Sequence, residues 1–406
     1  MKKYHLFEVF GIELEYMLVN KKDLKVAPQV DELLLLKQGE ITSDVENGEI
    51  AWSNELVAHV VELKTNGPAK DLKKLSDQFH QNIVEINKLL AAKELQLLPT
   101  ASNPMMNPLT DTQLWKHSYS EVYALYNRIF NCKGHGWANV QSMHINLPFY
   151  DDKEFEKLHA AIRVLLPLLP ALAASSPIFE AKLTGFKDSR MQVYKTNQKE
   201  IPVLAGKVIP ERVFSKAAYY KEIFEPINQA ITPYDTEKIL EHHFLNSRGA
   251  IARFDRNAIE IRVLDLQECP KADLAIAMFV VEVLKWMIDH LDLGKLKLLH
   301  EDELFKILNE TICSAEEANI ENVEFLSVLG FTEKKYTAQE IWKELFEKVA
   351  DKLNEETQQN LQVILKNGSL STRILKALGE NFSEENMVKV YLKLADCLQE
   401  NKLFVS

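Results

Sequence analysis

The sequence predicts an α+β fold, in which a part built of strands and helices precedes a helical C-terminal region. Residues 5–19 alternate between apolar and other side chains, as in a strand. Further strand-like segments, separated by amphipathic helical ones, continue to about residue 270, and from Lys271 onward nearly every segment has helical spacing. We place the boundary near Leu293-Gly294, which divides the chain into 1–294 and 295–406.

The size and charge of the chain narrow the class of partners. With 406 residues, of which 46% are hydrophobic, it can bury a large core and form two or three domain-sized units. Its formal net charge is -11 and its isoelectric point is near 5.6. Such a chain is a poor nonspecific partner for nucleic acid or an anionic membrane surface. We therefore expect small-molecule partners, no nucleic acid and no membrane; nothing in the sequence indicates an oligomeric state.

Cysteine usage and apolar segments indicate a cytosolic protein. The cysteines are far apart and form no CxxC pair, which predicts reduced thiols; they are Cys132, Cys269, Cys313 and Cys397. Near the N-terminus Glu8 interrupts the apolar run and no cleavage site follows, which favours a strand over a signal peptide. The most apolar segment, Ile162–Ala174, is too short to cross a bilayer and contains Pro167 and Pro170, so we expect a kinked core helix.

The first predicted strand, residues 5–19, has two different faces. One face is apolar and consists of Leu6, Phe10, Ile12, Leu14, Tyr16 and Leu18. The other consists of Val9, Gly11, Glu13, Glu15 and Met17. Because side chains alternate along a strand, Glu13 and Glu15 share a face.

Besides the kinked helix over Ile162–Ala174, six further segments are predicted up to residue 270. In chain order they are a strand over Glu55–Thr65, a helix over Pro68–Lys93, a helix over Asp111–Phe130, a strand over Asn139–Phe149 that Pro148 ends, a loop-rich segment over Pro177–Pro233, and a strand or hairpin over Ala250–Pro270. In the last of these, Glu260 and Arg262 share one face. Loop-rich segments often carry binding residues.

Charged side chains recur within several of these strands. A carboxylate that faces a core is costly unless it is paired or bound to a metal. For Glu13 and Glu15 alone, a solvated face of an antiparallel sheet is a sufficient explanation. Glu55, Glu62, His144 and Glu260 also lie in strand contexts, and together the six indicate a divalent cation, Mg²⁺ or Mn²⁺, because such ions prefer hard oxygen ligands.

Each of these residues also has a structural explanation that stays open. Glu62 can pair with Lys64 on a surface, His144 can be a core histidine with satisfied hydrogen bonds, and Glu260 can simply pair with Arg262. Glu55 and Glu62 are an odd number of positions apart, so in a regular strand their side chains would point to opposite faces. Both can face one site only if a bulge, bend or chain turn lies between them.

Common nucleotide-binding and nucleophile motifs are missing from the sequence. It contains no GxxxxGK[ST] loop, no GxGxxG after a strand and no GxSxG elbow. If ATP binds, metal ions and arginines must hold its phosphates.

Five sequence blocks carry a family resemblance. In order they are "FGIELEYMLV", "NELVAHVVELKT", "SMHINLPF", "LPALAASSPIFEAKLTGFKDSR" and "NAIEIRVLD". They resemble glutamate-cysteine ligase family 2, the ATP-dependent carboxylate-amine ligases, over about residues 5–270. The resemblance implies the glutamine synthetase-like fold, in which a curved antiparallel sheet forms a funnel for ATP and metal ions, with flanking helices.

The resemblance also implies a reaction and a set of site residues. ATP would phosphorylate a carboxylate, with L-glutamate expected, and an amine such as cysteine would attack the acyl phosphate, as in glutathione biosynthesis. By motif matching, one Mg²⁺ would be held by Glu15, Glu55 and Glu62, and another, bridging the ATP phosphates, by Glu13, His144 and Glu260. Arg262 would neutralise the transferred phosphoryl group, Arg190 would bind the substrate carboxylate unless it is a structural arginine, and Arg253 would contact phosphate.

The sequence departs from the family pattern in the region expected to select substrates. An H-V-H element is replaced by Ser142-Met143-His144, and an A-N-S-P element by Ala174-Ser175-Ser176-Pro177. The identity of the amine is therefore open. Two alternatives remain: a catalytically silent member of the fold that binds a ligand or a partner, and a metal-dependent hydrolase that uses the same carboxylates to activate water.

Overall fold

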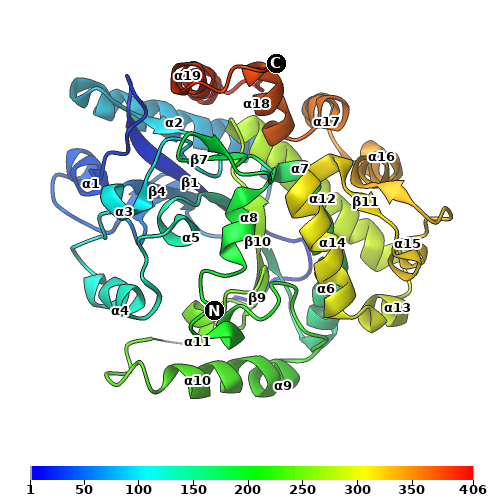
Figure 1. The fold of residues 1–406 in the computed structure, drawn as a ribbon. Coiled ribbons are helices and arrows are strands. Elements are labelled where there is room, and N and C mark those ends of the chain that lie inside the picture. Colours follow the sequence, from blue (N-terminus) through cyan, green and yellow to red (C-terminus); the bar gives the residue numbers. More distant parts are fainter. Residues whose placement is uncertain (1, 241, 406) are drawn as a thin grey trace.

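An eight-stranded antiparallel sheet forms the centre of the protein (Figure 1). The structure is a computed structural model that describes residues 2–240 and 242–405. Seven strands follow the order β2-β3-β4-β1-β6-β10-β9, and β5 pairs with the C-terminal half of β1. Their bounds are β1 Gly11–Asn20, β2 Asp44–Asn47, β3 Ile50–Asn54, β4 Val60–Thr65, β5 Leu95–Leu98, β6 Ser142–Pro148, β9 Ala250–Arg253 and β10 Ala258–Asp265. This arrangement confirms the α+β prediction.

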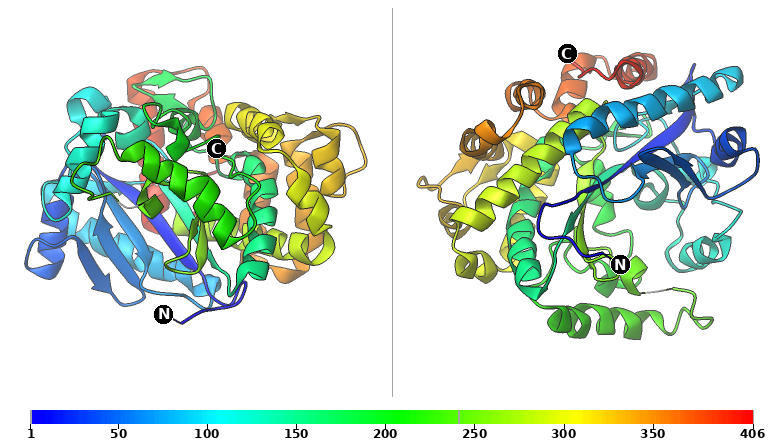
Figure 2. Two further views of the ribbon diagram at one scale, coloured as in Figure 1. Left: turned by 90° about the horizontal axis from the view of Figure 1, so that it is seen from below. Right: turned by 180° about the vertical axis from the view of Figure 1, so that it is seen from behind.

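The central strand β1 has one apolar face and one acidic face, as its alternation predicted. The apolar face is fully buried and consists of Ile12, Leu14, Tyr16 and Leu18. Helices α2 (Leu75–Leu90) and α12 (Pro270–His290) pack against each other and share this core (Figure 2, right). Glu13 and Glu15 therefore project from the opposite side of the sheet.

Two predicted strands begin later than expected. The strand predicted over 5–19 begins at Gly11. The strand predicted over Glu55–Thr65 was wrong for its first residues, because the chain turns there and joins β3 to β4 in a hairpin. Glu55 directly follows β3, whereas Glu62 lies within β4. This chain turn removes the difficulty that their opposite parity raised.

The helix predictions are partly confirmed. Helix α2 with a 3₁₀ turn at each end covers 72–93, close to the predicted 68–93. The helix predicted over Asp111–Phe130 was wrong for its first half, since α4 spans only Ser120–Phe130. Residues 113–115 instead form hydrogen bonds to the connection between β3 and β4. The N–H of Ala58 donates to the carbonyl of Gln113 at 2.8 Å, so this carbonyl is not available for hydrogen bonds within a helix.

The proline-bearing apolar segment is a kinked core helix, as predicted. Helix α6 (Asp152–Leu165) continues into a 3₁₀ turn (Leu166–Leu168) and then α7 (Pro170–Ala173), all within the core. Proline lacks a backbone N–H donor and clashes with the preceding turn, so the helix changes at both prolines: Pro167 lies in the 3₁₀ turn and Pro170 begins α7. Across the described residues, no helix is long and apolar enough to span a membrane.

The segment predicted as loop-rich, Pro177–Pro233, contains only short elements. They are β7 Ile178–Phe179, β8 Lys182–Leu183, α8 Ser189–Tyr194, a 3₁₀ turn Pro202–Leu204, α9 Lys216–Tyr219, a π-helical turn Tyr220–Phe224 and α10 Glu225–Ile231. Outside it, the remaining short helices before β10 are α1 Val30–Gln38, α3 Pro108–Asp111, α5 His135–Ala138 and α11 His242–Leu245. The segment Ala250–Pro270 forms the hairpin β9–β10, one of the two forms expected.

The C-terminal region is helical apart from one small ladder. Its helices are α13 Leu293–Leu298, α14 Glu301–Ser314, α15 Val323–Val328, α16 Ala338–Val349, α17 Glu355–Asn367, α18 Leu370–Leu378 and α19 Glu384–Glu400. The short strands β11 (Asn319–Ile320) and β12 (Tyr336–Thr337) pair within it, which the all-helical prediction missed. Helices α16 and α17 pack on α12, and α19 packs on α2. The division at residue 294 stays a prediction.

Candidate active site

Strand register brings the acidic side chains together on one face of the sheet. Glu13 on β1 lies opposite His144 on β6, and Glu15 lies opposite Glu62 on β4. Glu260 on β10 pairs with Asn146, two residues along β6 from His144. Antiparallel neighbours directly opposite one another project to the same side, so β4, β1, β6 and β10 present their polar residues to one place.

The first cluster consists of Glu13, His144 and Glu260. Each offers a ligand atom, and these atoms all lie within 4.8 Å of one another. His144 Nδ1 is 2.8 Å from Glu13 Oε2 and 3.8 Å from Glu260 Oε1. Asn146 Nδ2 donates a hydrogen bond of 3.0 Å to the other oxygen of Glu13. The cluster thus has the residue composition that suits a divalent cation.

The second cluster consists of Glu15, Glu62 and His144, with ligand atoms again within 4.8 Å of one another. The backbone N–H and the hydroxyl of Ser142 donate to Glu15 Oε2 at 2.6 and 2.8 Å. Ser142 Oγ also lies 2.8 Å from His144 Nε2. Lys64 Nζ is 3.1 Å from Glu62. His144 therefore stands between the two clusters.

Glu55 is not part of either cluster but lines the same cavity. Burial and then repulsion from Glu62 and Glu15 raise the pKa of Glu55 well above its ordinary value. Burial and the charge of Glu13 raise the pKa of Glu62 to about 7, although Lys64 opposes this. The negative charge of Glu55 and Glu62 is thus only partly compensated by neighbouring positive charge, and a bound cation would neutralise more of it.

Glu13 behaves differently because of its histidine partner. Burial acts to raise the pKa of Glu13, but the hydrogen bond and charge of His144 outweigh it and lower that pKa to about 2. The pKa of His144 is raised, because the contributions of Glu13 and Glu15 exceed the effect of burial. Their contact therefore favours the ionised carboxylate and the protonated imidazole over the neutral forms.

Two of the three arginines expected at the site line the cavity, Arg190 and Arg262. Arg262 Nε lies 3.1 Å from Glu260 Oε1, on the strand face that they were predicted to share. Arg190 is buried, and its Nε donates to Asp265 Oδ1 at 2.6 Å. Arg253 on β9 is not among the lining residues; it pairs with Asp255 at 2.9 Å and lies 3.8 Å from Glu260.

The cavity above the sheet has a volume of about 1120 Å³. Residues of the sheet form its floor, and residues of α4, α5, α8 and the segment before β9 contribute to its walls. Figure 1 shows α5 next to α8 near the centre of the view and α4 at the lower left. A cavity of this size that combines several carboxylates with two arginines can hold a nucleotide and small substrates.

Sequence reasoning missed several supporting residues, among them Ser142, Asn146 and Asp265. Ser142 and Asn146 flank His144 at two-residue spacing, so the alternation of β6 could have indicated that they share its face. Ser142 was noted only as a replacement for a family histidine, yet it bridges Glu15 and His144. Asp265 ends β10 and gave no such signal, because its partner Arg190 is far away in the sequence.

Comparisons with known proteins agree with the sequence blocks. Residues 9–392 match the model of glutamate-cysteine ligase family 2, a longer stretch than the blocks cover. An uncharacterised protein of Archaeoglobus fulgidus is 32% identical over 400 residues, which are 98% of this chain and 100% of that protein. A protein of Bradyrhizobium diazoefficiens, provisionally named glutamate-cysteine ligase 2, is 27% identical over 190 residues, which are 46% of this chain and 41% of that protein.

Two solved structures share the fold. A glutamate-cysteine ligase of Francisella tularensis in complex with AMP has a TM-score of 0.65 and 14% identity, covering 98% of this chain and 90% of that one. A bifunctional glutathione synthetase from Pasteurella multocida has a TM-score of 0.59 and 16% identity, covering 96% and 52%. Since the family model matches nearly the whole sequence, the chain belongs to glutamate-cysteine ligase family 2.

Proposed function

We propose that the protein is an ATP- and Mg²⁺-dependent carboxylate-amine ligase that acts on L-glutamate through an acyl phosphate. The observation that carries the proposal is the pair of ligand clusters that share His144, with Arg262, which lines the cavity together with His144, beside Glu260. Phosphoryl transfer requires mainly positioning and charge neutralisation, which metal ligands and an arginine supply without a covalent nucleophile.

The donor set fits hard divalent cations. We assign one Mg²⁺ to Glu13, His144 and Glu260, and another to Glu15, Glu55 and Glu62, a set in which Glu55 must turn toward its neighbours. The raised pKa values of Glu55 and Glu62 support this assignment, because carboxyl groups that repel one another bind cations readily. When bound, such ions would neutralise the phosphate oxygens of ATP.

The residues of the chain have separate tasks in the proposed reaction. Arg262 stabilises the negative charge of the phosphoryl group as it moves from ATP to a carboxylate oxygen of the substrate. Arg190 orients that substrate through a carboxylate, since a guanidinium fork suits one. The amine then attacks the activated carbonyl carbon, the C–N bond forms, and phosphate leaves with the electrons of the C–O bond. The AMP bound to the Francisella enzyme supports an adenine nucleotide as donor.

A turnover assay tests the proposal. Purified protein is incubated with ATP, Mg²⁺ and L-glutamate against a panel of amines, and ADP, phosphate and amide are measured. Amine-dependent ADP release with amide formation supports the ligase. Metal-dependent phosphate release without an amine would identify a hydrolase, and no ADP release with any amine would favour a catalytically silent protein.

A further inference from the structure

The cavity has two chemically different sides. One side consists of the sheet, with Glu15, Glu62 and Arg262, together with Glu55 after β3 and Arg190 on α8. The other side, formed by α4, α5 and the segments that follow α5 and precede β9, is mainly apolar; its residues include Val122, Tyr123, Tyr126, Trp137, Val140 and Leu240. A ligand that fills the cavity therefore has a charged end and an apolar end.

The aromatic residues of the apolar side use their polar atoms within the protein. The hydroxyl of Tyr126 donates to the carbonyl of Phe244 at 3.2 Å, and Trp137 Nε1 donates to the carbonyl of Asn197 at 3.0 Å. The ring of Trp137 also packs edge-on against Tyr126, with centroids 5.7 Å apart. These rings thus form a fixed aromatic surface, which offers a ligand dispersion contacts more than hydrogen bonds.

Positive charge in the described lining comes from the sheet and from α8. Among the lining residues that the structure describes, the lysine and arginine side chains are Lys64, Arg190 and Arg262. Each is already paired with an acid, respectively Glu62, Asp265 and Glu260. A carboxylate placed against the apolar side would lose its hydration without gaining a cationic partner, which is strongly unfavourable.

Negative charge stands at the border between the two sides. Glu55 follows β3, and the neighbouring Asn54 donates from Nδ2 both to the carbonyl of Glu55 at 3.0 Å and to the hydroxyl of Tyr123 at 3.2 Å. Glu55 and the aromatic surface are thereby held next to each other, and both line the cavity. Glu55 is one of the carboxylates assigned above to Mg²⁺, so an amine that packs against the apolar side would have its nitrogen next to the proposed metal site.

We propose that the amine acceptor is a primary amine with an aromatic or bulky apolar body and no carboxylate. This inference rests on the proposed ligase function and narrows its second substrate. In the step concerned, the amine nitrogen forms a bond to the carbonyl carbon of the acyl phosphate, and phosphate leaves with the electron pair of the broken C–O bond. The ammonium loses two protons overall, one to the departing phosphate and one to solvent.

Matched pairs of amines test this inference. The pairs are 2-phenylethylamine with L-phenylalanine and cysteamine with L-cysteine, which differ only by the carboxylate, and kcat/KM is measured from ADP release with ATP, Mg²⁺ and L-glutamate. We expect at least a tenfold preference for the decarboxylated member of each pair, and for 2-phenylethylamine over cysteamine. A preference for cysteine or phenylalanine would overturn this inference but leave the ligase proposal intact. If no amine elicits ADP release, the ligase proposal falls as well.

A charge placed in the apolar side gives a second test. Val122→Arg supplies the missing cation on α4 and is expected to shift the kcat/KM ratio toward phenylalanine at least tenfold. Ala124→Arg, at an exposed position of the same helix outside the cavity lining, is the matched control and should keep the parent ratio. If the ratio is unchanged in Val122→Arg, the inference is overturned. It is also overturned if the variant raises only the KM for ATP, because that result would show that the apolar side holds the adenine.

Discussion

Glu13 and His144 face each other across β1 and β6, with His144 Nδ1 2.8 Å from Glu13 Oε2. The contact joins two neighbouring strands, and Ser142 on β6 connects the same histidine to Glu15. Because His144 belongs to both ligand clusters, its orientation affects both proposed ions. A metal-binding side chain that is held by hydrogen bonds keeps its orientation when a metal ion binds or leaves.

Divalent cations are expected to stabilise the protein. At a Mn²⁺ concentration one hundred times the dissociation constant of a site, each bound ion is expected to add about 2.7 kcal/mol to the free energy of unfolding. Thermal unfolding with Mn²⁺ and with EDTA measures it. Glu260→Gln should lose most of the contribution of the ion assigned to Glu13, His144 and Glu260, whereas Glu85→Gln, on α2 away from the cavity, should retain the full gain. Equal gains in the two variants would contradict the metal assignment.

Asp265 is expected to act as a positioning residue for Arg190. Its Oδ1 accepts from Arg190 Nε at 2.6 Å, and its Oδ2 accepts from the N–H of Ser175 and the hydroxyl of Ser176, both at 2.8 Å. Removing the charge in Asp265→Asn weakens a charge-assisted hydrogen bond worth about 1.5–3 kcal/mol. We expect the KM for L-glutamate to rise about tenfold or more, with the KM for ATP unchanged.

The matched control for this variant is Ser175→Ala. It removes the hydroxyl of Ser175 but leaves its N–H bond to Asp265. Its KM for L-glutamate should stay within about twofold of the parent value. If Asp265→Asn raises the KM values for both substrates equally, a general structural role explains the residue better.

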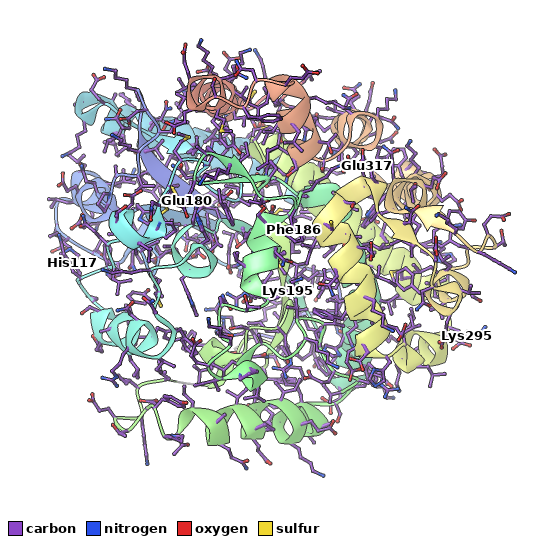
Figure 3. All side chains as sticks on the ribbon, in the orientation of Figure 1. His117, Glu180, Phe186, Lys195, Lys295 and Glu317 are labelled. Carbon is purple, nitrogen blue, oxygen red and sulfur yellow. The ribbon has the colours of Figure 1, made fainter. Side chains whose placement is uncertain are left out.

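The C-terminal region is expected to hold the loop that presents Arg190. The N–H groups of Lys187 and Asp188 donate to carbonyls at the end of α14, both at 3.1 Å, and Lys187 Nζ lies 3.3 Å from Glu316 and 2.8 Å from Glu317. The hydroxyl of Ser371 on α18 donates to the carbonyl of Lys187. Figure 3 shows Phe186 and Lys195 at the two ends of the segment containing α8, which packs on α14.

Removing the ion pairs of Lys187 with Glu316 and Glu317 should make the loop before α8 more mobile. In Lys187→Met we expect faster hydrogen exchange of the amides over 184–190 and a higher KM for L-glutamate. Lys199→Met, an exposed position beyond α8, is the control and should change neither. Unchanged exchange in Lys187→Met would show that the ion pairs with Glu316 and Glu317 do not hold the loop.

His159 gives a pH prediction outside the active site. Burial, with the charges of Arg163 and Arg248, lowers the pKa of His159 to about 3, against about 6.5 in the unfolded chain. The neutral form is therefore favoured by folding, and its contribution is present above pH 6.5 and lost as the pH falls. Between pH 6.5 and 5 the free energy of unfolding should fall by about 2 kcal/mol from this residue.

Urea unfolding at pH 7.5, 6.5 and 5 measures that slope. His159→Phe should flatten it, because a phenyl ring can take the place of the imidazole that stacks on Phe155. The exposed position His290, at the end of α12, provides the control His290→Phe. Parallel slopes in the parent and in His159→Phe would mean that His159 does not titrate in this way.

Local periodicity predicted much of the sheet and the shared faces within single strands, whereas the grouping of the ligands came from the family resemblance. The alternation of β1 placed Glu13 and Glu15 on one face, and the same rule linked Glu260 to Arg262. Glu55 could not be placed in this way. The apolar residues that follow it continue through the turn between β3 and β4, so the sequence pattern gave no sign of the hairpin. Periodicity within one element carries no information about such turns.

Contacts between distant segments were beyond sequence reasoning. Arg190 and Asp265 are 75 residues apart, and Lys187 and Ser371 are 184 apart. Neither pair has a local pattern, since each forms only when tertiary packing brings two loops or helix ends together. For the same reason the aromatic side of the cavity, contributed by α4 and α5, was not predicted as a unit.

The most direct test of the account follows an oxygen atom. L-glutamate labelled with ¹⁸O in its side-chain carboxylate is incubated with the protein, ATP, Mg²⁺ and 2-phenylethylamine, and the released phosphate is analysed by mass spectrometry. If the carboxylate is phosphorylated and the amine displaces phosphate, each phosphate carries one ¹⁸O. Unlabelled phosphate, released at the same rate with or without glutamate, would contradict the ligase and identify simple hydrolysis of ATP.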